Sequence, residues 1–292
     1  MSIRIVTDSN CDLPQSLVDR YQIVVIPFYI NIGTESYLDG VQMSHAEFYE
    51  GLPDFEHHPM TSVPGPGTFF KVFDSLAAEG ATEILAIHMG GSLSAMVNSA
   101  RLAAEEWDKA PVTVFDSGNL TIGTGLQVLA AAEAVAEGRT MDEILAMLED
   151  LSARTYCFAA LQTVEFLRRS GRLTRFQSGL ASVLQIKPLL KMNDNNYHME
   201  RVRTNNGATN RVLELVEELG PLEQLIVVHT HDRARADALH ERARDLFPQD
   251  ALVSSAEVTP VIGVHIGPGA AGFVAVQARE SKARLDESQE IE

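Results

Sequence analysis

Short apolar runs alternate with helical segments over the first 152 residues, and this alternation limits the folds open to the chain. Strand-like runs lie at 3–6, 23–26, 84–88 and 112–115. Helical patterns lie at 69–78, 95–107, 122–136 and from 140 onward. Alternating strands and helices are typical of a parallel sheet with helices on both faces. An α/β domain is therefore expected over 1–152. At its start, Asp12 is expected to cap a helix that has Pro14 in its first turn.

The pattern changes after residue 153. Strands are expected at 156–161, 225–229 and 273–277, with helices at 208–219 and 233–246. The turn-forming cluster 193–196 lies between the apolar runs 184–190 and 197–203, which predicts a hairpin and antiparallel pairing. We expect a second, smaller α/β domain with mixed or antiparallel strands over 153–280. The acidic tail 281–292 is expected to be solvated, with disorder as one interpretation.

The formal net charge of −17 disfavours binding to nucleic acids and to anionic lipid surfaces, because both need basic patches. The apolar runs are too short and too interrupted to span a bilayer, and the N-terminus leads directly into a strand-like run rather than a signal peptide. Cys11 and Cys157 are far apart, which favours free thiols in a reducing compartment over a disulfide. A cytoplasmic protein is expected.

A candidate binding loop follows the apolar run 84–88. The segment Gly90-Gly91-Ser92-Leu93-Ser94 leads into a helix, and the free N–H groups of a helix N-terminus attract anions. Glycines allow a ligand to approach the backbone, and two serines add hydroxyl groups. We expect a small anionic group here, with 61–64 and 263–269 as partner loops. None of the three loops contains Lys or Arg.

Polar side chains at the ends of the predicted strands could gather along one rim of the sheet, where α/β proteins bind ligands. They are Asp8, Ser62, Ser94 and Asp116. For the two aspartates we favour hydrogen bonds to loop backbone over metal binding or acid–base catalysis. His229 and His231 share a strand face but lack a clear third ligand, so no metal site is expected.

Several short motifs occur in one order along about 280 residues. They are Thr7-Asp8-Ser9, Thr61-Ser62-x-Pro64, Leu93-Ser94 with Asn98-Ser99-Ala100, Phe115-Asp116-Ser117, Leu167 through Gly171-Arg172-Leu173, Lys187-Pro188 and His265-x-Gly267-Pro268-Gly269. This ordered set resembles the DegV family of bacterial fatty-acid-binding proteins. The resemblance implies two α/β domains with one long-chain fatty acid, of the palmitate, stearate or oleate class, in a buried apolar tunnel between them. It implies no cofactor. In relatives that work with a fatty-acid kinase, the protein presents the carboxylate for phosphorylation to acyl phosphate.

By this resemblance, Thr61, Ser62, Ser94 and His265 would hold the carboxylate, and Gly91, Ser92, Ala95 and Gly267 would support the loops. The chain has Ser94-Ala95-Met96-Val97 where the family commonly has Ser-Gly-Thr-Tyr, and the methyl group of Ala95 narrows the approach to the backbone. The preceding Gly90-Gly91 pair is the candidate to compensate for this narrower approach to the backbone. Burial of about 15 methylenes at roughly 0.8 kcal/mol each would supply most of the affinity, and the head group would fix the orientation.

Other interpretations stay open. The hydroxyls at 61–62 and 92–94 could serve only as turn and helix caps, and His265 could be a core histidine. A serine hydrolase of acyl substrates would use Ser94, His265 and Asp8 or Asp116, but the Gly-x-Ser-x-Gly elbow is missing. The cations Arg172, Lys187, Arg201 and Arg203 could form ordinary salt bridges or a docking face for a kinase or another acidic partner. We favour a binding protein over an enzyme.

Overall fold

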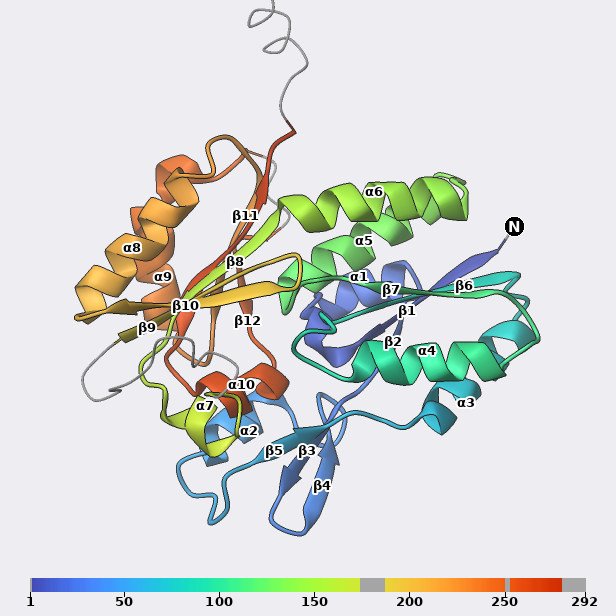
Figure 1. The fold of residues 1–292 in the computed structure, drawn as a ribbon, viewed down its shortest axis with the longest axis horizontal. Coiled ribbons are helices and arrows are strands. Elements are labelled where there is room, and N and C mark those ends of the chain that lie inside the picture. Colours follow the sequence, from blue (N-terminus) through green and yellow to red (C-terminus); the bar gives the residue numbers. More distant parts are fainter. Residues whose placement is uncertain (1, 174–186, 250–252, 280–292) are drawn as a thin grey trace, which may run out of the picture.

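The computed structural model describes residues 2–173, 187–249 and 253–279 (Figure 1). Its first sheet has four parallel strands in the order β2-β1-β6-β7. The strands are β1 (Ile3–Asp8), β2 (Val24–Ile26), β6 (Glu83–His88) and β7 (Val112–Asp116). In the register of the sheet, Val6 lies beside Val24 on one side and Ala86 on the other. The parallel α/β sheet predicted for the first half is confirmed.

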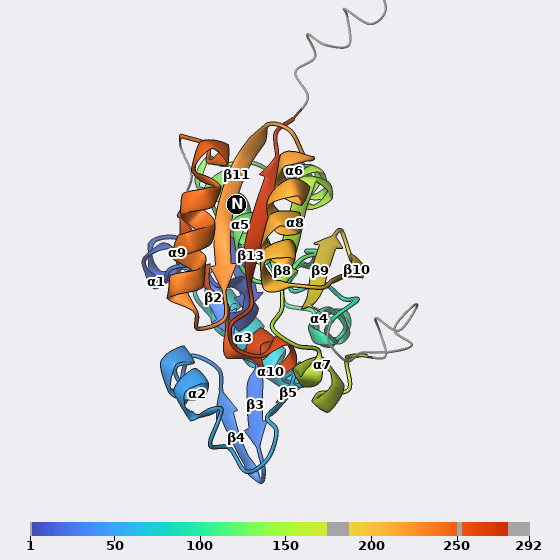
Figure 2. The same ribbon diagram turned by 90° about the vertical axis from the view of Figure 1, so that its left-hand side faces the viewer.

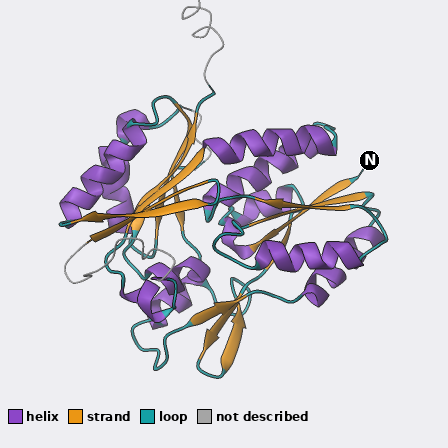
Figure 3. Cartoon of the chain, viewed as in Figure 1, coloured by secondary structure: helices purple, strands orange, loops and turns teal. Residues whose placement is uncertain are grey.

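Helices cover both faces of this sheet (Figure 3). They are α1 (Gln15–Arg20), α3 (Pro66–Ala78), α4 (Met96–Glu106), α5 (Ile122–Ala136) and α6 (Met141–Arg154). Side chains alternate between the faces of a strand, so Ile84 and Ala86 pack with α3 and α4. Leu85 and Ile87 pack on the other face with α1, α5 and α6. The apolar run at 84–88 is continuous because both of its faces are buried.

The second sheet has six strands in the order β10-β9-β8-β13-β11-β12, and it is mixed, as predicted. Strands β11 and β12 pair in parallel, and the other neighbours pair antiparallel. The strands are β8 (Thr155–Ala160), β9 (Lys187–Asn193), β10 (Asn196–Val202), β11 (Leu222–His229), β12 (Ser255–Glu257) and β13 (Ala271–Gln277). The last strand among the described residues, β13, lies between β8 and β11 in the sheet.

One face of the second sheet is covered by α8 (Asn205–Glu217) and α9 (Arg233–Arg242), and the other turns toward the first half (Figure 1). On that inner face, Cys157, Ala159 and Val274 belong to the same apolar core as Val6 and Met96 of the first half. Helices α5 and α6 also contact strands of the second sheet. One core therefore joins the two sheets.

A small antiparallel sheet, β4-β3-β5, lies below both larger sheets in Figure 1. It consists of β3 (Tyr29–Ile32), β4 (Glu35–Leu38) and β5 (Met60–Ser62), with α2 (His45–Gly51) between β4 and β5 in the chain. Helix α10 (Pro260–Ile266) packs against this sheet, α2 and α7 (Glu165–Arg169), and Figure 2 shows it between the small sheet and the six-stranded sheet. Segments from both ends of the chain meet there.

Two sequence expectations about helices were wrong in detail. Asp12 does not cap α1, because α1 begins at Gln15 after Pro14 and Asp12 ends the short 3-10 helix η1 (Ser9–Cys11) with φ +47°. The helix expected over 233–246 ends at Arg242 and continues as the 3-10 turn η3 (Arg244–Leu246). The hairpin around 193–196 is confirmed, but its expected residues 184–186 and the tail 281–292 lie outside the described residues. No helix in the described ranges is both long and apolar enough to cross a bilayer.

Candidate functional site

A cavity of about 450 Å³ lies where the first half, the small sheet and the six-stranded sheet meet. Most of its wall is apolar, with contributions from Phe28, Val63, Met89, Leu93, Leu120, Cys157, Ala159, Leu167, Leu190, Met192, Val261, Ile262 and Ile266. Its polar wall residues are Thr61, Ser62, Ser94, Arg172, Lys191, Tyr197 and His265. A largely apolar cavity with a few polar groups is the usual form of a small-molecule site.

The four residues predicted to hold an anionic head group all line this cavity. Thr61 and Ser62 lie at the end of β5, Ser94 precedes α4, and His265 lies near the end of α10. Thr61 Oγ1 and His265 Nε2 are 3.0 Å apart and share a hydrogen bond across 204 positions of the sequence. The structure therefore brings these three distant segments to one cavity, although Thr61 and Ser62 belong to a strand and His265 to a helix rather than to the loops expected from the sequence.

The N-terminus of α4 opens toward the cavity at Ser94 and Ala95, which both contribute to the wall. Ser94 Oγ accepts a hydrogen bond from the Met96 amide at 3.2 Å, while Ala95 is the N-cap residue of α4. The N–H groups of Leu93 and Ser94 donate to the Gly90 carbonyl and fold the loop tightly. The positive end of the α4 dipole favours a negative group at this place.

Asp116 and Asn195 hold the loop that precedes α4. Asp116 Oδ1 accepts hydrogen bonds from the amides of Gly91 and Gly118, each at 3.0 Å. A methyl group on Gly91 would lie 2.7 Å from Asp116 Oδ2, so this close approach requires glycine. Asn195, in the β9–β10 turn, accepts from the Ser92 amide at 3.2 Å. Sequence reasoning assigned Asn195 only to a turn, on the strength of the cluster 193–196, and the structure gives it a left-handed backbone (φ +61°).

Asp8 has a structural role in the buried core of the first half. Its carboxylate accepts from the amides of Asn10 and Met89 and lies 3.0 Å from His88 Nδ1. Both aspartates therefore hydrogen-bond loop backbone, as the sequence analysis favoured. The triad considered for a hydrolase needs a carboxylate beside His265, whereas the His265 Nε2 atom faces Thr61 and Asp8 faces His88.

The loop after His265 is fixed by close packing. Gly267 has φ +76°, and a methyl group there would overlap the ring of Phe166 in α7. The Gly267 carbonyl accepts a hydrogen bond from Thr230 Oγ1 at 2.7 Å. Gly267 therefore fixes the backbone after His265, through its left-handed conformation and its contact with α7.

The four cations grouped as a docking face differ in their surroundings. Arg172 lines the cavity and donates from Nη1 to the Ser170 carbonyl at 2.6 Å. Lys187 Nζ donates to the Gln162 carbonyl at 3.1 Å, while Arg201 and Arg203 are exposed. Lys191 also lines the cavity and pairs with Glu200. Sequence reasoning did not place Arg172 or Lys191 in the cavity wall, because neither belongs to the three segments predicted to bind the anionic group.

Two other groups that drew interest in the sequence have ordinary surroundings. Burial raises the pKa of the Cys157 thiol to about 12, so it is a neutral part of the cavity wall. His231 stacks on Tyr49 and lies 3.1 Å from Glu257, and His229 Nδ1 accepts from the Asp232 amide. Within 2–173, 187–249 and 253–279, no three His, Cys, Asp or Glu side chains gather in a way that could hold a metal ion.

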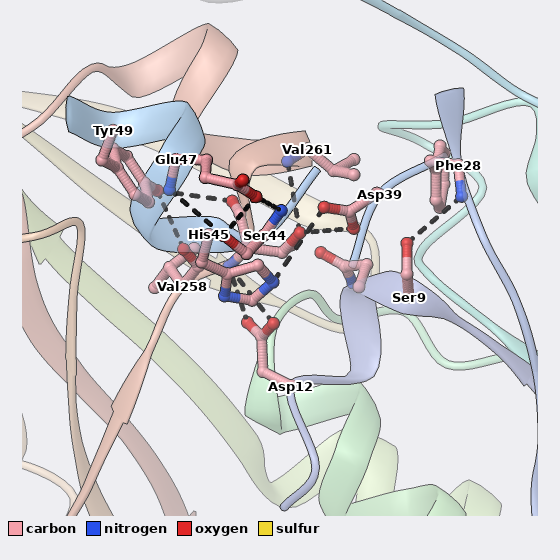
Figure 4. A network of polar contacts seen from close by, with 12 residues as sticks. Ser9, Asp12, Phe28, Asp39, Ser44, His45, Glu47, Tyr49, Val258 and Val261 are labelled. Carbon is pink, nitrogen blue, oxygen red and sulfur yellow. Dashed lines mark hydrogen bonds and ion pairs between the residues drawn. The ribbon is translucent and has the colours of Figure 1, made fainter. Parts of the chain in front are cut away.

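Two carboxyl groups from the first part of the chain hold the start of α10 (Figure 4). Thr259 Oγ1 donates to Asp39 Oδ2 at 2.7 Å and accepts from the Val261 amide at 3.3 Å. The Thr259 amide donates to the Asp12 carboxyl at 3.2 and 3.3 Å, and Thr121 Oγ1 donates to the same carboxyl. Asp12 therefore does serve at a helix N-terminus, but that helix is α10 rather than α1.

Both carboxyl groups ionise less readily than ordinary aspartates. Burial raises the pKa of Asp39, although hydrogen bonds from Ser9 and Thr259 and the nearby His45 oppose the rise. Burial also raises the pKa of Asp12 well above its usual range, opposed by the hydrogen bond from Thr121 and reinforced by the charge of Asp39. Protein surrounds the Asp12 carboxyl even though the residue is partly exposed.

We expect Asp39→Asn to gain stability relative to the wild type as the pH rises above about 4, the ordinary pKa of an aspartate. A carboxyl whose pKa is raised by folding adds stability below its unfolded-state pKa, and this stability is lost as the pH rises through the folded-state pKa. Asparagine cannot ionise, so it avoids that loss. Thermal unfolding of both proteins across this pH range tests the prediction. Asp54→Asn, at an exposed position, controls for the removal of one carboxylate, and parallel wild-type and Asp39→Asn curves would contradict it.

Comparisons with known proteins agree over nearly the whole chain. A family model described as "Uncharacterised protein, DegV family" matches residues 2–278. A DegV domain-containing protein of Deinococcus radiodurans is 35% identical over 277 residues, covering 93% of this chain and 97% of the relative. One from Listeria innocua is 30% identical over 275 residues, with the same coverage.

Solved structures give the same result. A DegV family protein from Thermus thermophilus, described by its fatty-acid binding, is 32% identical with a TM-score of 0.85 and covers 95% of this chain and 100% of its own. DegV from Bacillus subtilis, described as a fatty-acid-binding protein, is 26% identical with a TM-score of 0.86 and the same coverage.

Proposed function

This chain belongs to the DegV family, and from that premise we propose that it binds one long-chain fatty acid in the cavity described above. In this proposal Thr61, Ser62, Ser94 and His265 hold the carboxylate, and the apolar wall encloses the tail. The bound acid is of the palmitate, stearate or oleate class. The protein acts as a lipid carrier and performs no chemistry on its ligand.

The observation that carries this proposal is the composition of the cavity wall: a mostly apolar surface with hydroxyl and imidazole groups from three distant segments of the chain. Such a wall suits an amphiphile. Burying about 15 methylenes at roughly 0.8 kcal/mol each gives a gross gain of about 12 kcal/mol, from which the ordering of ligand and side chains removes a large part. The tail would thus supply affinity, and hydrogen bonds would orient the head group.

The first experiment is mass spectrometry of the organic extract of the purified protein, beside its native mass. A fatty acid in one-to-one ratio with the chain would support the proposal and identify the tail. An extract without lipid, together with failure to take up added palmitate or oleate, would overturn it.

Thr61→Val is expected to weaken the binding of stearate by about 5- to 20-fold, because it removes a hydroxyl that bonds His265 and is proposed to bond the carboxylate. Displacement titrations on delipidated protein measure the change. Thr34→Val, at an exposed position in the turn between β3 and β4, is the matched control. Equal affinities for the two variants would exclude Thr61 from the head-group site.

As a finer proposal, the carrier presents its carboxylate to a fatty-acid kinase and docks through exposed cations. Arg201 and Arg203 lie exposed at the end of β10 and just beyond it, which suits contact with an acidic surface. Charge reversal at both positions is expected to weaken binding to the kinase at least severalfold, without changing fatty-acid affinity. Kinase binding that is unaffected by the reversal would reject this docking face.

The hydrolase alternative predicts turnover of a chromogenic acyl ester that disappears in Ser94→Ala. The observed partners of His265 and Asp8 do not favour it, since Thr61 bonds the imidazole that would act as the base. We expect no turnover above background by either protein, and turnover lost in the variant would favour the enzyme.

A further inference from the structure

The N-terminus of α10 and its His265 end are both held by the small sheet. At the N-terminus, Asp39, directly after β4, accepts the Thr259 hydroxyl. Near the other end, Thr61 in β5 bonds His265. Strands β4 and β5 flank β3 in one sheet, so the distance between the two anchors is set by the sheet. From these contacts we infer that Asp39 is a positioning residue for the carboxylate site, acting through Thr259 and α10 on His265. This inference rests on the fatty-acid function proposed above.

The link from Asp39 to α10 is short and buried. Asp39 is 2% exposed and Thr259 is fully buried, so the hydrogen bond between them is shielded from water. The same Thr259 hydroxyl caps the Val261 amide, and the Thr259 carbonyl accepts from Ile262 and Gly263 at 3.0 Å. A shift of Thr259 therefore moves the whole first turn of the helix.

Helix α10 has little freedom to absorb such a shift. It has seven residues, and six positions separate Thr259 from His265, about 9 Å along a helix. Tyr49 Oη donates to the Val258 carbonyl at 2.8 Å, and the same hydroxyl lies so close to Gly263 that a methyl group there would overlap it. At the far end, Gly267 is packed on Phe166. A displacement at Thr259 would therefore reach His265.

Asp12 holds the backbone of Thr259, whereas Asp39 holds its side chain. It accepts the Thr259 amide from a position 247 residues away, at the end of the 3-10 turn after β1. Thr121, which precedes α5, bonds the same carboxyl. Asp12, from the first half of the chain, thus accepts the backbone amide of Thr259, while Asp39, beside the small sheet, accepts its hydroxyl.

The test uses Thr259→Val, which keeps the shape of the side chain but loses the hydroxyl, and Thr259→Ser, which restores it. Each delipidated protein is titrated with stearate and with the uncharged alcohol of the same chain length. We expect Thr259→Val to weaken stearate binding about tenfold and alcohol binding less than about twofold, with Thr259→Ser close to the wild type. The His265 resonance, read by NMR with isotope-labelled histidine and assigned by its loss in His265→Gln, should shift in Thr259→Val even without ligand.

Two further variants separate positioning from loss of a helix cap. Thr140→Val removes the capping hydroxyl of α6, far from the cavity, and should lower the melting temperature without changing either affinity or the His265 resonance. Asp39→Ala leaves the Thr259 cap on Val261 but removes its buried acceptor, and should reproduce the shift of the His265 resonance. This variant also decides the question if Thr259→Val does not fold.

An unchanged His265 resonance and an unchanged preference for stearate over the alcohol, in Thr259→Val and Asp39→Ala, would overturn the inference. If the His265 resonance shifts in Thr259→Val but not in Asp39→Ala, the effect comes from the cap on the Val261 amide. Asp39 would then have no positioning role. A wild-type protein that takes up no stearate would contradict the proposed function, and the ligand-free His265 resonance would still decide the positioning role.

Discussion

Ala159→Phe is expected to lower the affinity for stearate about 100-fold while the protein remains folded. The Ala159 side chain lies on the inner face of β8 and lines the cavity, so a phenyl ring there would enter open volume that the tail is proposed to fill. Displacing three or four methylenes, at about 0.8 kcal/mol each, costs about 3 kcal/mol, which corresponds to about 100-fold in affinity. Displacement titration and thermal unfolding give the two readouts.

Ala234→Phe is the matched control, because Ala234 is exposed on α9 and the added ring meets solvent. A shorter acid should lose less affinity in Ala159→Phe than stearate does, since fewer of its methylenes would be displaced. Equal losses for short and long acids would place the tail away from Ala159 and require another path for it through the cavity.

Gly125→Ala is expected to lower the free energy of unfolding by about 3 kcal/mol or more, against the usual effect of this substitution in a helix. Alanine ordinarily stabilises a helix interior relative to glycine by up to about 1 kcal/mol. In α5, however, a methyl group on Gly125 would overlap the carbonyl oxygen of Cys11 and lie 3.1 Å from Leu13 Cγ. Backbone cannot give way as a flexible side chain can, so α5 and η1 would have to separate.

Gly67→Ala makes the same change in α3, and here we expect no loss of stability. A methyl group at Gly67 would meet nothing within 4 Å among the described residues, and the position is exposed. Its melting temperature should equal or exceed that of the wild type. Gly125→Ala should melt about 6 to 12 °C lower than the wild type. A melting temperature within a degree or two of the wild type for Gly125→Ala would show that η1 moves away at little cost.

Local sequence patterns predicted much of the fold. The run 84–88 indicated a buried strand because its apolar residues are continuous, and the helical pattern from 140 onward indicated α6. The cluster at 193–196 indicated the β9–β10 turn. The rule that ligands bind beyond the carboxyl ends of parallel strands, together with the family resemblance, pointed to Ser94, and the structure places it in the cavity wall with His265.

Other features depend on contacts between distant segments, which local patterns do not contain. Asp12 precedes a proline and a helix, so its local surroundings indicated a cap for α1, yet its carboxyl bonds Thr259 near the other end of the chain. Arg172 comes from the segment just after α7, and α7 packs against α10, which also contributes to the cavity wall. The same holds for Asn195, whose partner Ser92 is 103 positions away.

The central place of β13 in the six-stranded sheet has a consequence for vectorial synthesis. Strand β13 is translated after β8 and β11 but separates them in the sheet, and each of them bonds to it along most of its length. Until it has left the ribosome, β8 and β11 each present an unpaired edge, which is the kind of surface on which nascent chains pair wrongly or aggregate. The first half can fold before that, but the second sheet closes only after β13 has been synthesised. A premature stop just before residue 271 would therefore leave two open sheet edges instead of a slightly shortened protein.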